Sequence, residues 1–218
     1  MLRLHYYPSN ASFAPQVLLR ELDLPFEPVL VDRTQQAHKS PAYLKLNPNG
    51  LIPVLEDGAL VLYETLAICL HLVDKRPAAG LAPAVGTAER ARFYKWMAWL
   101  SNTLQPALIR YFYPERLVDE GNADGAAQVR RHAQAAVVTQ LQQLDDQLAA
   151  VATQGPWLLG ERYSAADPYA FMLCRWTRGF DRQPARDFVH IGPWLQRVLA
   201  RPAVQQTVAF EKLPLPLV

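Results

Sequence analysis

The stretch Leu51–Thr65, with the sequence LIPVLEDGALVLYET, decides how the rest of the chain is interpreted. Two short apolar runs flank the pair Asp57-Gly58. Such a pair is a strong hairpin signal, because a type I′ turn needs positive φ at both central residues. Pro53 opens the first run, and the start of a strand is one of the few strand positions that tolerate proline. The stretch therefore predicts a β-hairpin that leads into a helix.

Glu64 and Thr65 stand at the start of that helix. A carboxylate and a hydroxyl beside the unpaired backbone N–H groups of a helix N-terminus can hold a zwitterionic ligand. The acid would bind an ammonium group, and the hydroxyl with the N–H groups would bind a carboxylate. Taken alone, however, the two residues favour a simpler interpretation, which is a helix cap.

The residues before this stretch indicate a strand–helix–strand unit. Residues 2–6 alternate apolar and polar side chains, turn residues follow at 8–12, and an amphipathic helix is expected at 13–22. A second strand at 26–31 would pair parallel with the first, through a right-handed crossover. A polar loop and a short helix at 42–46 then lead to the hairpin.

The residues after the hairpin predict a linker and a helical region. Residues 77–87 are rich in proline, alanine and glycine, which is typical of a linker. No strand is predicted beyond them, whereas helical periodicity supports long helices at 88–112 and 126–152. The sequence therefore predicts an α/β domain at 1–76 and an all-α domain at 88–218.

The composition excludes several classes of protein. The chain has 218 residues, 50% of them hydrophobic and 19% charged, so we expect a sizeable core and little disorder. The net charge of +2 comes without a basic run, which gives nucleic-acid binding no support. Cys69 and Cys174 lie in apolar helical patterns and predict buried free thiols, without a disulfide or metal site. With no signal-peptide features and no membrane-spanning apolar run, the sequence predicts a soluble cytoplasmic protein.

Together these features resemble the cytosolic glutathione transferases over nearly the whole chain. The resemblance is carried by four motifs in a fixed order: Asn47-Pro48-Asn49-Gly50, Ile52-Pro53-Val54-Leu55, Glu64-Thr65, and Ser164 with Asp167. The family implies a thioredoxin-like domain joined to an all-helical domain, a homodimer, and glutathione as cosubstrate. It also implies a cis peptide bond before Pro53. The Ile52 backbone would then add the cysteinyl backbone of glutathione as an antiparallel rung.

The resemblance further implies which residues bind the two ends of glutathione. Glu64 and Thr65 match the acid–hydroxyl pair that holds the γ-glutamyl end, with threonine in place of the usual serine. His38 or Lys39 could neutralise the glycyl carboxylate, although both are equally well explained as solvated loop charges. Many relatives carry a polar residue at the position of Leu51, so one glycyl contact is expected to be missing here.

The transferase reaction needs glutathione as the thiolate, which is the nucleophilic form. A free cysteine thiol has a pKa of about 8.5, and lowering it by about 2 units requires about 2.7 kcal/mol of selective anion stabilisation. One or two hydrogen bonds to a charged acceptor contribute about 1.5–3 kcal/mol each. A single hydroxyl at the start of the first helix is therefore adequate.

Three hydroxyls compete for this role. Ser12 directly precedes the first helix and matches the serine of the beta-type pattern Pro-Gly-Ala-Cys-Ser, whose cysteine is replaced here by Ala11. That replacement excludes a redox role for this position. Ser9 matches the catalytic serine of the zeta-type motif Ser-Ser-x-Ser, but the arginine-containing continuation of that motif is absent. Tyr6 resembles the tyrosine of Tyr-type transferases or is a structural aromatic, and Ser12 is preferred among the three.

The sequence does not identify the electrophile that would accept the thiolate. Gln105, Tyr111 and Tyr113 fall near the end of the first long helix and are expected to line an acceptor pocket between the domains. The predicted function is conjugation of glutathione to small hydrophobic electrophiles. The alternatives are a glutathione-dependent isomerase or lyase, which would regenerate the thiolate, and a non-enzymatic glutathione-binding module.

Overall fold

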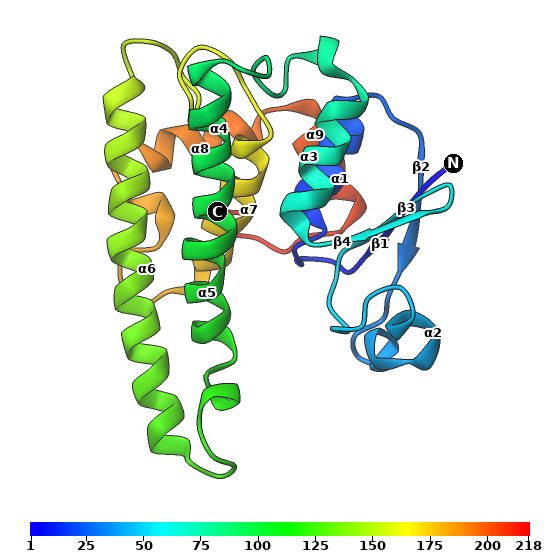
Figure 1. The fold of residues 1–218 in the computed structure, drawn as a ribbon. Coiled ribbons are helices and arrows are strands. Elements are labelled where there is room, and N and C mark those ends of the chain that lie inside the picture. The colour runs from blue at the N-terminus through cyan, green and yellow to red at the C-terminus, as the bar shows by residue number, and fades with distance from the viewer. The chain divides into compact units, whose positions relative to one another are not determined.

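The computed structural model describes all 218 residues and divides them into two compact units (Figure 1). The first unit comprises Met1–Ala82 and Val198–Leu215, and the second comprises Pro83–Arg197 and Pro216–Val218. The sequence-based division placed all residues from 88 onward in the helical domain. The structure instead groups the segment Val198–Leu215 with the α/β unit, because its helix packs against the first helix of the chain.

The first unit is built on a four-stranded sheet with the strand order β2-β1-β3-β4. The central strand β1 (Leu2–Tyr6) pairs parallel with β2 (Phe26–Leu30) and antiparallel with β3 (Val54–Asp57). The hairpin partner of β3 is β4 (Leu60–Tyr63). This arrangement confirms the strand–helix–strand unit and the hairpin that the sequence predicts.

The turn of the hairpin differs from the predicted type I′ turn. Asp57 is the last residue of β3 and pairs with Leu60, so the two turn residues are Gly58 and Ala59. Gly58 has a φ of 62°, whereas Ala59 is outside the positive-φ region. A type II′ turn has this pattern, because it needs positive φ only at its first central residue.

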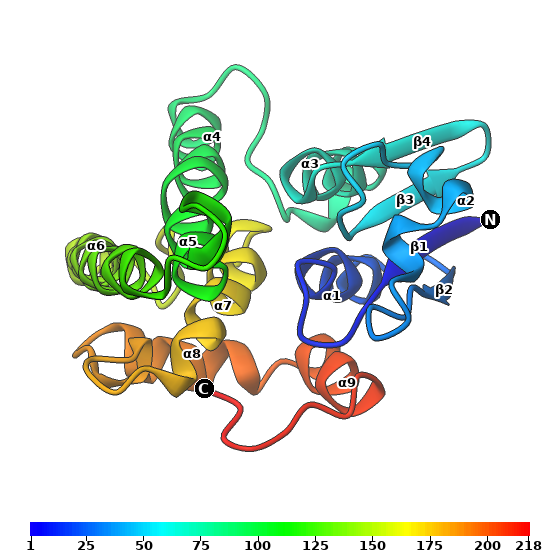
Figure 2. The ribbon, with the colours of Figure 1, turned by 90° about the horizontal axis from the view of Figure 1, so that it is seen from below.

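Two helices, α1 (Phe13–Glu21) and α3 (Thr65–Lys75), pack together on one side of the sheet (Figures 1 and 2). Their fully buried side chains form the core of the unit with the central strands, and they include Val17, Leu18, Ile68 and Leu72. The connection between β2 and β3 contains two short helical segments, η1 (Ala37–Lys39) and α2 (Pro41–Leu44). A further turn, η2 (Pro77–Ala79), follows α3, and α9 (Pro202–Phe210) lies beside α1.

The second unit is helical throughout. Its principal helices are α4 (Ala88–Trp99), α5 (Gln105–Phe112), α6 (Ala123–Val151), α7 (Ala166–Trp176) and α8 (Ile191–Leu199), whose last two residues belong to the first unit. Short turns join them: η4 (Pro114–Leu117), η5 (Thr177–Gly179) and η6 (Ala185–Asp187). No helix of the chain is both long and apolar enough to span a membrane.

The single helix predicted at 88–112 is interrupted in the structure. A π-helical segment, η3 (Leu100–Leu104), separates α4 from α5. Pro106 explains the interruption, because it lacks an N–H group and its ring crowds the carbonyl four residues earlier, that of Asn102. Widening the backbone at this point accommodates the proline without ending the helix.

Candidate functional site

The peptide bond between Ile52 and Pro53 is cis, as the resemblance implies. The carbonyl before it, that of Leu51, accepts hydrogen bonds from the Tyr43 hydroxyl at 2.9 Å and from Asn47 Nδ2 at 2.8 Å. Two buried side chains thus hold the backbone immediately before the cis bond. The backbone N–H and C=O of Ile52 take no part in the hydrogen bonds of the turns and strands, so they can pair with an extended ligand.

Glu64 and Thr65 join the hairpin to α3 in an unusual backbone conformation. Glu64 has a φ of 75°, a region that non-glycine residues rarely occupy and that is enriched at binding sites. Its side chain is exposed and makes no capping hydrogen bond to α3. The simpler interpretation of the pair as a helix cap therefore fails for Glu64, whose carboxylate is left facing solvent.

Thr65 connects this corner to the loop before α1. Its side chain is buried, and its hydroxyl donates a 3.5 Å hydrogen bond to the carbonyl oxygen of Ala11. Residues more than fifty positions apart in sequence therefore meet within the first unit. The corner at 64–65 and the loop at 7–12 form one continuous candidate site.

The loop at 7–12 is held by its own backbone and by Ser12. The hydroxyl of Ser12 donates to the carbonyl oxygen of Tyr7 at 3.3 Å and accepts from the Tyr7 N–H at 3.4 Å. Ser12 is fully buried and makes no capping hydrogen bond to α1. Ser9 is half-buried and has a φ of 61°, which is again the left-handed region. The two serines thus differ in exposure. The two hydrogen bonds of Ser12 fix the backbone of the loop at Tyr7.

Tyr6 lies at the end of β1, and its ring packs against Phe210 with 5.4 Å between centroids. Burial raises the pKa of the Tyr6 phenol above its ordinary value, and the negative charge of Glu211 raises it further. Tyr6 therefore stays protonated at neutral pH. It can donate a hydrogen bond, but it does not act as a base.

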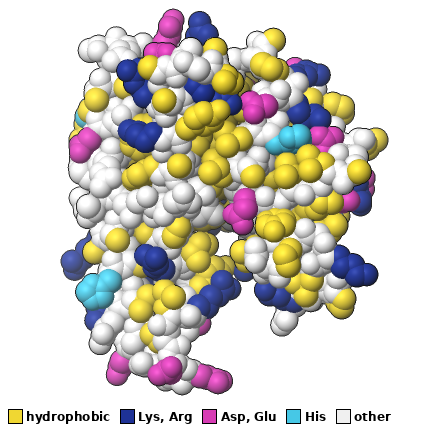
Figure 3. Space-filling view, in the orientation of Figure 1, with side chains coloured by type: hydrophobic (Ala, Val, Ile, Leu, Met, Phe, Trp, Pro, Cys, Tyr) yellow, Lys and Arg dark blue, Asp and Glu magenta, His cyan; other side chains and the backbone are white.

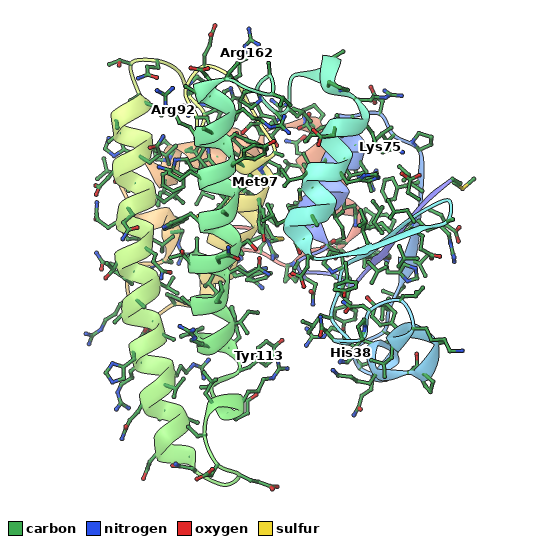
Figure 4. The ribbon with its side chains drawn as sticks, in the orientation of Figure 1. His38, Lys75, Arg92, Met97, Tyr113 and Arg162 are labelled. Carbon is green, nitrogen blue, oxygen red and sulfur yellow. The ribbon has the colours of Figure 1, made fainter.

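His38 and Lys39 lie in η1, next to the turn that precedes Leu51 (Figure 4). The Lys39 ammonium donates to the carbonyl oxygen of Asn49 at 3.3 Å and is largely exposed. Gly50 has a φ of 60°, and a Cβ atom there would meet the His38 carbonyl oxygen at 2.8 Å. This close approach requires glycine at position 50. It also keeps the Lys39 ammonium near the backbone that leads to Ile52.

The three residues predicted for the acceptor pocket lie along α5 and just after it. Gln105, at the start of α5, accepts a 2.6 Å hydrogen bond from the Tyr169 hydroxyl. Tyr111 packs on Phe180, with ring centroids 4.4 Å apart, and Tyr113 follows the end of the helix (Figure 4). Eight residues separate Gln105 from Tyr113, which corresponds to roughly 12 Å of helix. Gln105 therefore lies at the opposite end of α5 from the two tyrosines, and Tyr111 and Tyr113 have different aromatic and cationic neighbours.

One residue near the site was not predicted from the sequence. Glu211 follows α9, is buried, and accepts a 2.9 Å hydrogen bond from the backbone N–H of Ser9. No motif marks it, since its proximity to the loop arises from the packing of α9 on α1. The only sequence signal is an acidic residue at the end of an apolar helix, which is unremarkable by itself.

The chain combines a thioredoxin-like sheet and a cis-proline with a following helical domain, which is the fold of a class of glutathione-binding proteins. Comparison with known protein families gives the same class. The glutathione S-transferase N-terminal domain family matches residues 2–74, and the glutathione S-transferase C-terminal domain family matches residues 101–202. The chain belongs to the glutathione S-transferase family. The family and the two-part fold expected from the sequence are thereby confirmed.

The relatives come from both plants and bacteria. Glutathione S-transferase 3 of Zea mays is 34% identical over 206 residues, which cover 91% of this chain and 89% of that protein. A glutathione S-transferase of Xanthomonas campestris is 31% identical and covers 97% of this chain and all of its own. A crystal structure of a glutathione transferase homologue from Sulfitobacter with bound glutathione superposes with a TM-score of 0.87, at 28% identity, covering 98% and 99% of the two chains.

Proposed function

We propose that the chain binds glutathione along the first unit and adds its thiolate to small hydrophobic electrophiles. The observation that carries the proposal is the contact between Thr65 Oγ1 and the Ala11 carbonyl, which makes the corner and the loop one site. The γ-glutamyl end would lie at Glu64 and Thr65, and the cysteinyl backbone would pair with Ile52. The sulfur would then point toward the loop at 7–12.

Each end of glutathione finds a group of suitable charge in this arrangement. The exposed carboxylate of Glu64 would bind the γ-glutamyl ammonium, and the α3 N-terminus would favour the carboxylate beside it. Lys39 would neutralise the glycyl carboxylate, because its ammonium lies next to the Ile52 segment. His38 is the alternative partner for that carboxylate.

Ser12 is the proposed donor to the sulfur. Its hydroxyl bonds to the Tyr7 backbone at 3.3 and 3.4 Å, which is longer than typical hydrogen bonds of these kinds. A bond to a thiolate is charge-assisted and stronger, so the hydroxyl can turn from the carbonyl to the sulfur. Ser9 is the alternative donor, which its partial exposure favours. The thiol proton leaves to solvent. The thiolate then forms the bond to the electrophilic carbon, and the bond from that carbon to the leaving group breaks, so that the leaving group departs with the electron pair, as chloride from an aryl chloride.

The proposal extends to the class of electrophile and to a homodimer. Tyr111 and Tyr113 supply aromatic surface suited to a planar or apolar acceptor. A homodimer would cover apolar side chains of the edge strand β4, of which Leu60 and Val61 are exposed. Figure 3 shows hydrophobic side chains gathered over part of the first unit.

The test is to titrate bound glutathione and to follow product formation. Ultraviolet absorbance reports the thiolate, and chlorodinitrobenzene serves as a generic aryl halide acceptor. We expect thiolate near neutral pH and one glutathione consumed for each product molecule. Glutathione binding without conjugation of several electrophile classes would instead indicate a binding module. Turnover without net glutathione consumption would indicate an isomerase.

A further inference from the structure

The helix α9 is attached to α1 at both of its ends. At its start, the Arg201 guanidinium forms a two-point ion pair with Glu21, at 2.6 and 2.7 Å. At its end, Glu211 reaches the other end of α1 and the loop before it. The two helices therefore run antiparallel, and Figure 2 shows them side by side. We call residues 201–211 the C-terminal strap.

Glu211 is the inner anchor of this strap. Its side chain is 4% exposed, and one carboxylate oxygen accepts from the Ser9 N–H at 2.9 Å. The other oxygen accepts from Nε2 of Gln16 at 3.3 Å, and Gln16 is itself fully buried on α1. Tyr6 and Arg20 are the titratable side chains whose pKa values respond to the charge of Glu211. Because both of its oxygens accept hydrogen bonds inside the protein, the buried carboxylate of Glu211 is held in one position.

The position of Ser9 makes this anchor relevant to chemistry. Ser9 occupies the left-handed region with a φ of 61°, which a serine adopts only when its surroundings hold it there. The hydrogen bond to Glu211 supplies such a restraint from outside the loop. Without it, the loop would keep its internal bonds but would lose this restraint at Ser9.

We propose that Glu211 is a positioning residue that holds the loop at 7–12 in the conformation that places its two serines beside the bound glutathione sulfur. This proposal rests on the proposed function. The role is geometric, because a negative charge near a thiolate would by itself disfavour the anion. A displacement of about 1 Å in a reacting group can lower a rate by about a hundredfold, so a modest loop shift has a measurable cost.

The experiment compares three variants. Glu211→Ala removes the anchor, Glu211→Gln keeps a carbonyl oxygen for the Ser9 N–H, and Arg201→Ala breaks the strap at its far end, away from the loop. Hydrogen exchange of the loop 7–12 and the pKa of bound glutathione thiol are measured for each. We expect Glu211→Ala to speed exchange in the loop, to raise the thiol pKa by about one unit and to lower kcat/KM about tenfold.

The other two variants make the result specific. Glu211→Gln should recover most of the rate and the thiol pKa, whereas Arg201→Ala should lower the melting temperature without moving either. The proposal is wrong if Glu211→Ala leaves loop exchange unchanged, or if Arg201→Ala shifts the thiol pKa equally. Loop exchange needs no catalysis, so it decides the matter even if the wild-type protein proves not to activate glutathione.

Discussion

The helix starts at the candidate site differ from most helix starts of the second unit in how their backbone N–H groups are paired. In the first unit, α1 and α3 begin without any side-chain cap, although Ser12 and Glu64 stand at the capping positions. In the second unit, side chains accept hydrogen bonds from backbone N–H groups at the starts of four helices: Thr87 for α4, Asn122 for α6, Ser164 for α7 and Asp145 for α8. Closed starts stabilise the helical unit, whereas the open start of α3 leaves donors for a ligand. At the uncapped start of α1, backbone carbonyls of the loop accept from the Phe13 and Gln16 N–H groups.

Asp167 is the most densely bonded residue at a closed start, and its loss should have the largest effect. Its fully buried carboxylate accepts from the N–H of Leu158, from both the N–H and the hydroxyl of Ser164, and from Trp194 Nε1. Asp167→Ala should lower the free energy of unfolding by about 4 kcal/mol, since each orphaned buried donor costs roughly 1–3 kcal/mol. Urea unfolding measures this.

The exposed residue Asp146 is the matched control, because Asp146→Ala should change stability by no more than about 0.5 kcal/mol. The contrast between closed and open starts requires that glutathione affinity stay unchanged when Asp167 is replaced. A protein that keeps its stability but loses glutathione binding would reverse the assignment of the two kinds of helix start.

Glu64 tests the open start of α3. Glu64→Gln should raise the dissociation constant for glutathione by roughly tenfold to a hundredfold, since a charge-assisted hydrogen bond contributes about 1.5–3 kcal/mol. Stability should hardly change, because the side chain is exposed and caps nothing. Isothermal titration calorimetry measures the affinity. Glu161→Gln, at an exposed glutamate of the second unit, should leave it unaltered.

Ser12 tests the start of α1, which no side chain caps. Ser12→Ala should raise the pKa of the bound thiol by about one unit and lower kcat/KM about tenfold at neutral pH, since one donor to the thiolate is lost. The rate should recover at higher pH, where the thiolate forms without help. A pH–rate profile provides the measurement. If Ser12→Ala retains full activity while Ser9→Ala loses it, the donor is Ser9.

The smallest effect is expected at the hairpin, far from any helix start. Hydrogen bonds from Lys75 and His71 hold the pKa of the Asp57 carboxyl below its ordinary value. The resulting stabilisation is present above the unfolded-state pKa of about 3.9 and is lost as the pH falls through the lower folded-state value. Asp57→Asn should therefore cost less than about 1 kcal/mol at pH 7 and nothing in strong acid. Urea midpoints at the two pH values test this, and an equal loss at both would contradict it.

A structural feature can be predicted from the sequence when neighbouring residues cause it. The hairpin, the cis bond at Pro53 and the pair Glu64-Thr65 lie within fifteen residues, and turn chemistry and family motifs mark them directly. The sequence does not predict the interruption at 100–104, because the helical periodicity continues on both sides of Pro106 and a single proline leaves that pattern unchanged. The hairpin turn was assigned to type I′ because residue preference does not reveal that Asp57 is drawn into the strand and bonded to α3.

The sequence by itself determined the family, the order of the elements and the candidate residues for holding glutathione, because periodicity, turn residues and short motifs are properties of neighbouring residues. Only the tertiary structure decided that Thr65 meets Ala11, that Ser12 is turned inward, and that Glu211 holds Ser9 across two hundred residues. Such contacts depend on how α9 packs against α1 and how α3 packs beside the loop. Packing of that kind is set by the shapes of whole buried faces, which no single stretch of the chain contains.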